Sequence, residues 1–405
     1  MSLVKFWSGL HGWCKILIAL VIGLVVGLVG RDQVMWLAPI GQLFINAIHL
    51  LIAPVIFSAI VCAILSVHNG AKMGRLTLHA VLWYGLCMLL ASVIGLLVAK
   101  WIHPGMGVHL GLSLKQAVTL HQAHHNSVAS FIANLVPSNP TRAFLNENVL
   151  QIVVFAILLG ISINMAGEKG EPVARFFHSL SSVAFKLAAL VMKFAPYGVF
   201  ALIAWTFAQF GFTALLPLLK FVLTVYLGCA LMIALVYGSF LWFKLRLSLP
   251  AFMRAIASAF LFAFTTSSSA ATLPLSMACC EKNLGVKESV SRFLLPLGAS
   301  FNLNGLSIYL TVAVVFAANL YGVHLSLTDQ IVIVVTTVIS AMGAAAVPGS
   351  ALIVMGAIMT AVNIPLGAIA LIAGVDRIND MAQTATNVAG DIFVTKMVAE
   401  QDSDI

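Results

Sequence analysis

The sequence has very little charge. Only 8% of its 405 residues are Asp, Glu, Lys or Arg, whereas soluble domains carry about 25%. Hydrophobic residues make up 61% of the chain. Apolar runs such as 16–30 and 214–243 exceed the roughly 20 helical residues that cross a bilayer, and they lack the alternation of membrane-spanning strands. The composition therefore excludes a soluble domain and predicts an integral membrane protein with several spanning helices.

The motifs of a membrane enzyme or a primary pump are also missing. No GxxxxGK[ST] loop is present to hold a nucleotide. An intramembrane aspartyl protease needs aspartates on facing helices and a GxGD motif, but this chain has VAGD and its intramembrane aspartates share one segment. HQAHH (121–125) has no acidic or Cys companion and is interpreted as a solvated outer loop. The cysteines lack metal-ligand spacing and are interpreted as small apolar side chains: Cys14, Cys62, Cys87, Cys229, Cys279 and Cys280.

The chain does contain a series of long apolar segments. The first six cover approximately 13–30, 36–66, 77–102, 128–166, 177–210 and 214–243. The stretch VPSNPTRAFLNENV interrupts the fourth segment, so we expect two or three short helices there. No small-residue cleavage site follows the first segment, which is therefore expected to stay in the protein as a helix rather than leave as a signal peptide.

Basic residues lie at the ends of these segments, so the formal net charge of +8 does not indicate nucleic-acid binding. They follow alternate segments, at Lys72 and Arg75, Lys169 and Arg175, Lys244, Arg246 and Arg254, and Lys396. The positive-inside rule places these loops and the N-terminus in the cytoplasm. The sequence thus predicts a multi-pass protein of the plasma membrane, which is the inner membrane in a bacterium, with lipids around it and no nucleic-acid partner.

After residue 250 small and polar residues interrupt the apolar segments. The interruptions are FTTSSSAATLP (264–274), GASFNLNG (298–305), MGAAAVPGSA (342–351) and DRINDMAQTATNVAGD (376–391). They form two pairs, because Asn302 follows Ser268 at the same distance along the chain as Gln383 follows Gly349. We infer a duplicated unit of a helical hairpin and a helix. Paired breaks of this kind line a protein-enclosed cavity, and in secondary transporters they mark the binding site.

The stretch 376–391 carries the chemistry. Of the thirteen Asp and Glu, only Asp376, Asp380 and Asp391 lie within an expected span. Each costs about 2.5–3.5 kcal/mol at a helix centre, so something must compensate. Arg377 can neutralise one of them by pairing with Asp380 or by lying near Asp376, which leaves a negative charge for a cation. On a helix the polar residues share a wedge of about 120°: Asp376, Arg377, Asp380, Gln383, Thr384, Asn387 and Asp391.

The other interruptions complement these acids. NLNG (302–305) favours unwound backbone whose carbonyls coordinate a cation, and TTSSSAA offers hydroxyls and N–H groups at a hairpin tip that would bind an anion. Together they predict a site for a zwitterion accompanied by cations. A cation channel is the rival function from another class, since a negative cavity suits conduction, but it gives no reason for the anion-favouring tips.

These stretches resemble the dicarboxylate/amino acid:cation symporter family, the glutamate-transporter homologues. The resemblance covers nearly the whole chain. It rests on the serine-rich tip, on LPLGASFNLNG in place of the family's NMDGT helix, on VPG at the second tip and on D…D..QT..N…D in the last helix. Within the fourth and fifth segments it also includes ANLVPSNPTRAF, VLQIVVFAILLGI and FAPYGVFALIA.

The resemblance implies an all-α polytopic membrane protein with eight transmembrane helices, two re-entrant helical hairpins and inverted repeats. It implies a homotrimer in which a transport domain moves as an elevator against a scaffold that makes the trimer contacts. By position, residues 1–76 and 128–212 would form the scaffold, and residues 77–127 and 213–405 the transport domain. The second hairpin would act as the gate.

The resemblance also assigns site residues. Asp380 would bind the ammonium of a substrate and Asn387 its carboxylate, with Thr384 beside them. The substrate pocket would be lined by Ser267, Ser268, Ser269, Leu306, Val347, Ala351, Asp380, Gln383, Thr384 and Asn387. One Na+ site would use Gly298, Asn302, Asn387 and Asp391, and a second would use mainly the carbonyls of Ser300, Leu303, Ala341, Met342 and Ala344.

Two departures from the family concern the substrate. Gln383 stands where acidic-amino-acid transporters have an arginine, and Leu306 stands where they have the threonine of NMDGT. A buried acidic side chain would meet no charge partner there, which is costly, whereas Asp380 argues for an amino group. We therefore expect symport of a small neutral amino acid. The alternative is an acidic amino acid, glutamate or aspartate, or a dicarboxylate.

Further departures affect the cations. The aspartate of the family's NMDG motif is Asn304 here, and its threonine–serine pair corresponds to Cys87 and Met88, although Tyr84 is kept. The loss of a carboxylate and two hydroxyls predicts a degraded innermost site, and therefore one or two Na+ sites or a proton at one step. Ser267 stands where some members carry an arginine, so Arg377 is the expected substitute partner of Asp376.

The Asp380→Asn variant should abolish binding of any substrate with an amino group, because it removes the negative charge that faces the ammonium. Titration of purified protein with labelled amino acids checks this expectation. An affinity equal to that of the wild type would refute the assignment of Asp380.

Overall fold

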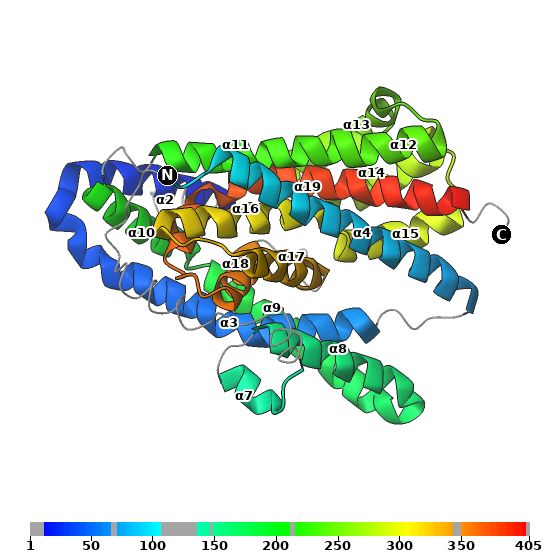
Figure 1. Cartoon of the computed structure of the whole chain (residues 1–405), viewed down its shortest axis with the longest axis horizontal. Helices are drawn as coiled ribbons and strands as arrows, with labels where there is room; N and C mark the ends of the chain where they lie inside the picture. The colour runs from blue at the N-terminus through cyan, green and yellow to red at the C-terminus, as the bar shows by residue number, and fades with distance from the viewer. Residues whose placement is uncertain are drawn as a thin grey trace, which may run out of the picture.

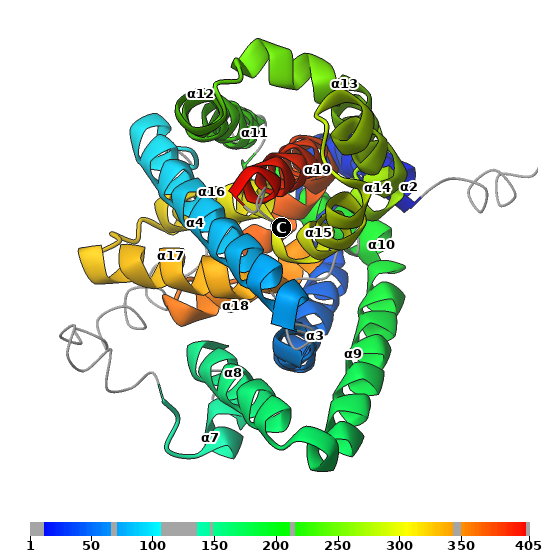
Figure 2. The same cartoon turned by 90° about the vertical axis from the view of Figure 1, so that its right-hand side faces the viewer.

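The computed structural model describes residues 12–65, 71–106, 136–145, 149–210, 215–342 and 350–401. Within these ranges all the regular secondary structure is helical, which confirms the expected class. The long helices α4, α11 and α19 run along the length of the molecule, and α7 and α8 lie at its edge (Figures 1 and 2).

The helices of the first half follow the apolar segments with one correction. The expected single span at 177–210 is two helices, α9 and α10, because Pro196 at the start of α10 lacks an N–H and cannot continue a preceding helix. The interrupted fourth segment contains α7 and α8. The elements are α2 (Gly12–Gly30), η1 (Arg31–Leu37), α3 (Ala38–Leu65), α4 (Ala71–Ile102), α7 (Pro140–Leu145), α8 (Val149–Met165), η2 (Gly167–Gly170), α9 (Glu171–Met192) and α10 (Ala195–Phe210).

The second half begins with a long helix that contains a π-helical segment. Its parts are α11 (Leu215–Leu231), the π-helix η4 (Met232–Tyr237) and α12 (Gly238–Leu245). The remaining elements are α13 (Leu249–Thr266), α14 (Ser269–Ala278), the π-helix η5 (Cys279–Asn283), α15 (Glu288–Phe301), α16 (Asn304–Tyr321), α17 (Leu327–Met342), α18 (Ser350–Ala361) and α19 (Ala368–Gln401).

Several of these helices can cross a membrane. By length and composition, four stretches of the described chain qualify: Leu76–Ile102, Leu216–Leu245, Leu249–Thr266 and Glu288–Tyr321. Shorter apolar helices lie at Ile18–Gly30, Ala53–Cys62, Val154–Met165, Pro196–Trp205, Leu327–Met342 and Ala351–Ala361. A multi-pass membrane protein is thus supported, while the count of eight spans and the re-entrant course of the hairpins stay predictions.

Glycines allow the first helices to pack closely. An added Cβ at Gly27 would lie 2.4 Å from the carbonyl oxygen of Ala204, so α2 and α10 touch backbone to backbone. Small residues permit this approach in membrane helices, where van der Waals packing drives association. α10 also packs on α3, and α3 in turn packs on α8 and α9.

The last helix, α19, lies at the centre of the second group of helices. It packs on α11, α13, α15 and α16, and Figure 2 shows these helices arranged around it. α16 is buried along almost its whole length. The polar residues of the wedge predicted at 376–391, called the polar stripe of α19 from here on, are therefore surrounded by protein rather than by lipid.

Each predicted hairpin consists of two helices that pack on each other. α13 and α14 are joined by Ser267 and Ser268. Ser267 has a positive φ of 51°, and the Ser268 hydroxyl accepts a hydrogen bond of 3.2 Å from the Ala271 amide at the start of α14. α17 packs on α18, while residues 343–349 of the second tip, with the predicted site residues Ala344 and Val347, lie outside the described residues.

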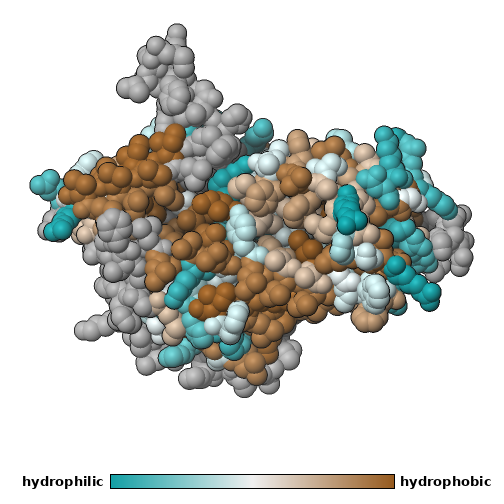
Figure 3. Space-filling view, turned by 90° about the horizontal axis from the view of Figure 1, so that it is seen from above, coloured by the Kyte–Doolittle hydropathy of each residue, from teal (hydrophilic) through white to brown (hydrophobic). Residues whose placement is uncertain are grey.

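Large apolar side chains are exposed on the outside of the bundle. Val29, Trp101 and Phe243 are 81%, 75% and 80% exposed. Figure 3 shows hydrophobic residues over much of one face, with hydrophilic residues gathered toward the right-hand end. Apolar surface on this scale is typical of contact with lipid.

Candidate functional site

The chain leaves helical geometry inside its most deeply buried candidate span. Between α15 and α16, Asn302 (φ −102°, ψ 69°) and Leu303 (φ −97°, ψ 61°) are not helical, and both are buried. Such a break releases backbone groups from the helical hydrogen-bond ladder and makes them available to a ligand. The break predicted from NLNG is confirmed, and both flanking helices pack on α19.

Asp391 of α19 lies directly against this break. Its Oδ1 accepts a hydrogen bond of 2.9 Å from Asn302 Nδ2, and the residue is 3% exposed. An added Cβ at Gly298 would lie 2.9 Å from Asp391 Oδ1 and 3.1 Å from the Tyr84 hydroxyl, so glycine is needed for this approach. The Asn302 Oδ1 oxygen is buried without a hydrogen-bond partner among the described residues. A carboxylate beside an unpaired amide oxygen fits Na+, because hard cations take oxygen ligands.

Asn387 lies one turn before Asp391 and is also held by the start of α16. Its Oδ1 accepts a hydrogen bond of 2.7 Å from the Gly305 amide. An added Cβ at Gly305 would lie 2.3 Å from the Gln383 carbonyl oxygen, so α16 meets α19 backbone to backbone. Since the oxygen of Asn387 is engaged, its N–H groups are the part that could donate to a substrate carboxylate.

Asn304, in the innermost predicted cation site, is held by another side chain. Its Nδ2 donates to the Tyr237 hydroxyl at 2.8 Å, and Tyr237 donates to the Thr386 carbonyl at 3.2 Å. Tyr237 comes from the π-helix η4. Sequence reasoning missed it, because a single tyrosine in an apolar run is no signal of function.

The other residues of that innermost site are buried on α4. Tyr84, Cys87 and Met88 are each 0% exposed, and the Tyr84 hydroxyl donates to the Leu294 carbonyl at 3.1 Å. Sulfur side chains are soft ligands and poor partners for Na+. The weakened innermost site stays a prediction that this arrangement favours.

Asp380 and Arg377 form an ion pair toward the other end of the stripe. Arg377 Nη1 lies 3.6 Å from Asp380 Oδ2, and their side chains are 15% and 31% exposed. Arg377 Nη2 donates to the Thr266 carbonyl at 3.0 Å, next to the first hairpin tip. Asp380 Oδ1 accepts a hydrogen bond of 3.3 Å from the Thr384 hydroxyl. The predicted i,i+3 pairing is confirmed, and it brings the stripe together with the first hairpin.

Asp376 has a partner that the sequence did not indicate. The Tyr309 hydroxyl of α16 donates to Asp376 Oδ1 at 2.6 Å, and Tyr309 is 0% exposed. We expected Arg377 to be the partner of Asp376, but the direct hydrogen bond comes from Tyr309, whereas the ion pair of Arg377 is with Asp380.

Gln383 and Leu306, the two expected departures in the substrate pocket, are both buried, at 2% and 6% exposed. Gln383 Nε2 and the Ser267 hydroxyl have no hydrogen-bond partner among the described residues. Buried donors are normally paired, so a ligand or water is their expected partner. Ser269 is also buried, at the start of α14.

The second predicted Na+ site is only partly described. Leu303 lies in the break, Ala341 is buried near the end of α17, and Met342 ends that helix. Ser300 is more open, and its hydroxyl donates to the Pro296 carbonyl at 3.3 Å. Ala351, at the start of α18, is half-buried. Ala344 lies outside the described residues, so this site stays a prediction.

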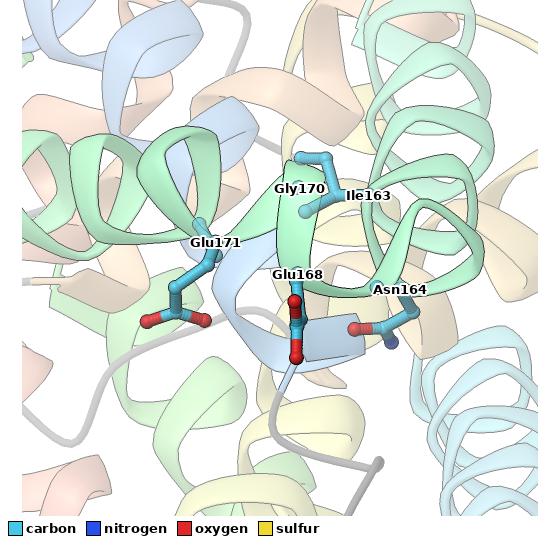
Figure 4. Close-up of a pocket in the computed structure, with 7 residues that line it drawn as sticks. Ile163, Asn164, Glu168, Gly170 and Glu171 are labelled. Carbon is cyan, nitrogen blue, oxygen red and sulfur yellow. The ribbon is translucent and has the colours of Figure 1, made fainter.

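A surface hollow of about 340 Å³ lies apart from the stripe, at the turn from α8 through η2 to α9. Figure 4 shows the carboxylates of Glu168 and Glu171 beside it, with Asn164 from the end of α8. Glu171 lies 3.8 Å from Arg175 in an exposed ion pair. None of the predicted site residues lines this hollow, and the candidate site stays that of α19 and the elements around it.

A buried polar stripe that meets a broken helix and a serine-tipped hairpin is typical of a secondary transporter. The chain belongs to the sodium:dicarboxylate symporter family, whose family model matches residues 13–401. The C4-dicarboxylate transport protein of Rhodospirillum rubrum is 36% identical over 407 residues, covering 99% of this chain and 90% of that protein. The proton/sodium-glutamate symport protein of Geobacillus stearothermophilus is 34% identical over 386 residues, covering 93% and 91%. That of Bacillus subtilis is 33% identical over 395 residues, covering 95% and 91%.

Membership confirms the resemblance stated from the sequence and places the protein among membrane transporters rather than enzymes. Cation-coupled symport is supported, with Na+ as a coupling ion. The expectation of a small neutral amino acid is not supported. The relatives are named for C4-dicarboxylates and for glutamate, which correspond to the stated alternative. The expectation depended on Gln383 and Leu306 as departures from the family and on Asp380 as the partner of an amino group.

The Gly298→Ala variant should weaken Na+ coupling, because the added methyl group would push Asp391 and Tyr84 away from the break. The Na+ concentration for half-maximal substrate binding should rise about tenfold, equivalent to about 1.4 kcal/mol, as measured by Na+ titration of the purified protein. Gly85→Ala on α4 is the matched control, since its Cβ would meet nothing within 4 Å. An unchanged Na+ dependence in Gly298→Ala would contradict the assignment.

Proposed function

We propose that the protein is a symporter that carries an acidic amino acid, glutamate or aspartate, across the plasma membrane together with Na+, H+ or both. The family and its glutamate-transporting relatives support this class of substrate. The argument for an acidic amino acid rather than a dicarboxylate comes from the polar stripe on α19.

The observation that carries the proposal is the ion pair of Asp380 with Arg377, at 3.6 Å beside the first hairpin tip. Asp380 is the more exposed of the two side chains, and it supplies the negative charge that an α-ammonium requires. Arg377 supplies a guanidinium, the group best suited to bind a carboxylate through two hydrogen bonds. An acidic amino acid satisfies both partners, with its α-carboxylate on the N–H groups of Asn387 and the hairpin tip.

A C4-dicarboxylate fits this stripe less well. It has no ammonium group for Asp380, and its two carboxylates would add negative charge next to the acids of α19. Like charges in a buried site repel strongly. The aspartate at position 380 therefore favours an amino acid over a simple dicarboxylate.

The charges of the stripe require co-transported cations. When ionised, the three aspartates of the stripe carry more negative charge than the guanidinium of Arg377 can neutralise. An acidic substrate adds one more negative charge. We propose that one Na+ binds Asp391 at the α15–α16 break and that a second uses the carbonyls of the break and of α17. We propose a proton on the stripe as the further positive charge, in line with the predicted weakening of the innermost Na+ site.

We further propose the domain motion and assembly implied by the family resemblance. α2, α3, α8, α9 and α10 would form the scaffold of a homotrimer with a cytoplasmic N-terminus. α4 and the elements from α11 to α19 would form the transport domain, moving as an elevator with the second hairpin as its gate. The packing of α3 on α8, α9 and α10, and of α19 on α11, α13, α15 and α16, supports this grouping.

A neutral amino acid is the second candidate, and one observation favours it. The buried Gln383 Nε2 has no partner among the described residues, and a hydroxyl or amide side chain could accept its hydrogen bond. In that case Arg377 would serve only to hold Asp380 and the hairpin tip.

Uptake into proteoliposomes decides between the candidates. Glutamate, aspartate, succinate, alanine, serine and glutamine would be offered as labelled substrates under a Na+ gradient, a proton gradient or both. The proposal expects glutamate or aspartate to enter fastest and only with a cation gradient. Faster entry of serine or alanine would establish the second candidate, and faster entry of succinate would overturn the role of Asp380.

Two variants then test the residues. Arg377→Gln should raise the KM for the acidic substrate about 100-fold, because removing one partner of a buried charge pair costs about 3 kcal/mol or more. Arg175→Gln, at an exposed ion pair, is the control. Gln383→Arg should not improve the uptake of a neutral amino acid. If it raises the uptake of the acidic substrate by a larger factor than Arg377→Gln lowers it, position 383 rather than Arg377 dominates substrate selection.

A further inference from the structure

A second polar feature lies at the end of the molecule where α12, η5 and α19 meet. A pocket of about 360 Å³ is lined there by Lys244, Leu245, Arg246, Leu247, Asn283, Leu284, Lys396 and Glu400. Three of these residues are cationic and one is acidic, so the lining has a net positive charge. The pocket includes none of the residues assigned to substrate or Na+.

The local backbone explains why the cations gather. α12 ends at Leu245, and Arg246 then adopts a left-handed conformation with φ 51°, which turns the chain sharply before α13 begins. The Leu247 amide closes this turn by donating to the Leu241 carbonyl at 3.0 Å. Lys244 and Arg246 are thereby held beside α19, from which Lys396 approaches.

Polar side chains also fix the wall of the pocket. Asn283 Nδ2 donates to the Ala255 carbonyl of α13 at 2.6 Å, which ties the end of η5 to the hairpin. Lys396 pairs with Glu400 one turn further along α19, and its side chain is only 16% exposed. Lys244 and Arg246 are exposed, so the pocket combines one largely buried cation on α19 with two exposed cations at the end of α12.

The position of the pocket is that of a membrane surface. It lies where the candidate span Leu216–Leu245 ends and just before the next, Leu249–Thr266, begins. Trp242 and Phe243, directly before the pocket residues, are 62% and 80% exposed. Exposed aromatic residues at the end of a span mark the boundary between lipid and water.

We propose that this pocket binds the phosphate headgroup of an anionic phospholipid, with Lys244, Arg246 and Lys396 as the cationic partners and with the acyl chains lying along Trp242 and Phe243. Basic residues after alternate spans assign this end to the cytoplasmic leaflet, where anionic lipids attract cationic groups near the surface. Arg and Lys are the usual partners of phosphate oxygens. The bound lipid would join the end of α12 to the end of η5 and to α19.

Native mass spectrometry of the full-length protein with phosphatidylglycerol or phosphatidylcholine tests the proposal. The wild type should retain phosphatidylglycerol in preference to phosphatidylcholine. The double variant Lys244→Gln/Arg246→Gln should lower the affinity for phosphatidylglycerol about 25-fold, since each cation near the surface contributes about fivefold. The matched control, Lys169→Gln/Arg175→Gln, removes the same charge from another loop on the expected cytoplasmic side and should keep the wild-type preference.

Thermal unfolding in nanodiscs gives a second measurement. Phosphatidylglycerol should raise the unfolding midpoint of the wild type and of the control, but not that of the Lys244→Gln/Arg246→Gln variant. An equal response in all three proteins would overturn the proposal. Millimolar inorganic phosphate would also be added to the wild type in phosphatidylcholine nanodiscs. If phosphate alone raises the unfolding midpoint as much as phosphatidylglycerol does, the pocket binds a soluble anion and the lipid assignment is overturned.

Discussion

The structure depends on the placement of carboxylates inside an apolar bundle. Asp376, Asp380 and Asp391 lie on one helix that is surrounded by other helices, where an uncompensated charge is expensive. Each has a different polar neighbour: a tyrosine hydroxyl for Asp376, a guanidinium for Asp380 and an asparagine amide for Asp391. Only the second is positively charged. The described residues around the acids therefore supply less positive charge than three ionised carboxylates carry, which agrees with the cation-coupled symport of the family.

The same requirement explains where the helices touch. Gly298 and Gly305 stand at the places where α15 and α16 meet α19, and a methyl group at either would collide with the stripe or its backbone. Their close approach places the unwound residues Asn302 and Leu303 beside Asp391. A looser contact would admit water to the acids, which would weaken the electrostatic demand for a cation. Two glycines thus permit the tight packing of α15 and α16 against the acids of α19.

Much of this arrangement could be predicted from the sequence. The wedge of polar residues on α19 followed from helical periodicity, and the α15–α16 break followed from residues that disfavour helix. The partners Tyr309 and Tyr237 could not be predicted, because an aromatic residue in an apolar run has the same pattern whether or not its hydroxyl meets a polar group. The division of the fifth segment before Pro196 was not predicted, because the hydrophobic composition continues on both sides of the proline. Gln383 and Leu306 led to the expectation of a neutral amino acid, which the names of the relatives do not support, because single positions in a sequence do not show which other groups of the folded site face the substrate.

The π-helical segment η4 changes which side chains of α11 and α12 face the interior of the protein. A π-turn holds one residue more than an α-turn, so it offsets the faces of the helix before and after it by about 100°. α11 can therefore direct one set of side chains, such as the fully buried Phe221, into the apolar core, while Tyr237 at the end of the segment stacks on Phe393 at 4.9 Å and reaches Asn304. A single uninterrupted α-helix has one inward face throughout. The extra residue gives this helix two, and the second of them reaches Asn304 at the α15–α16 break.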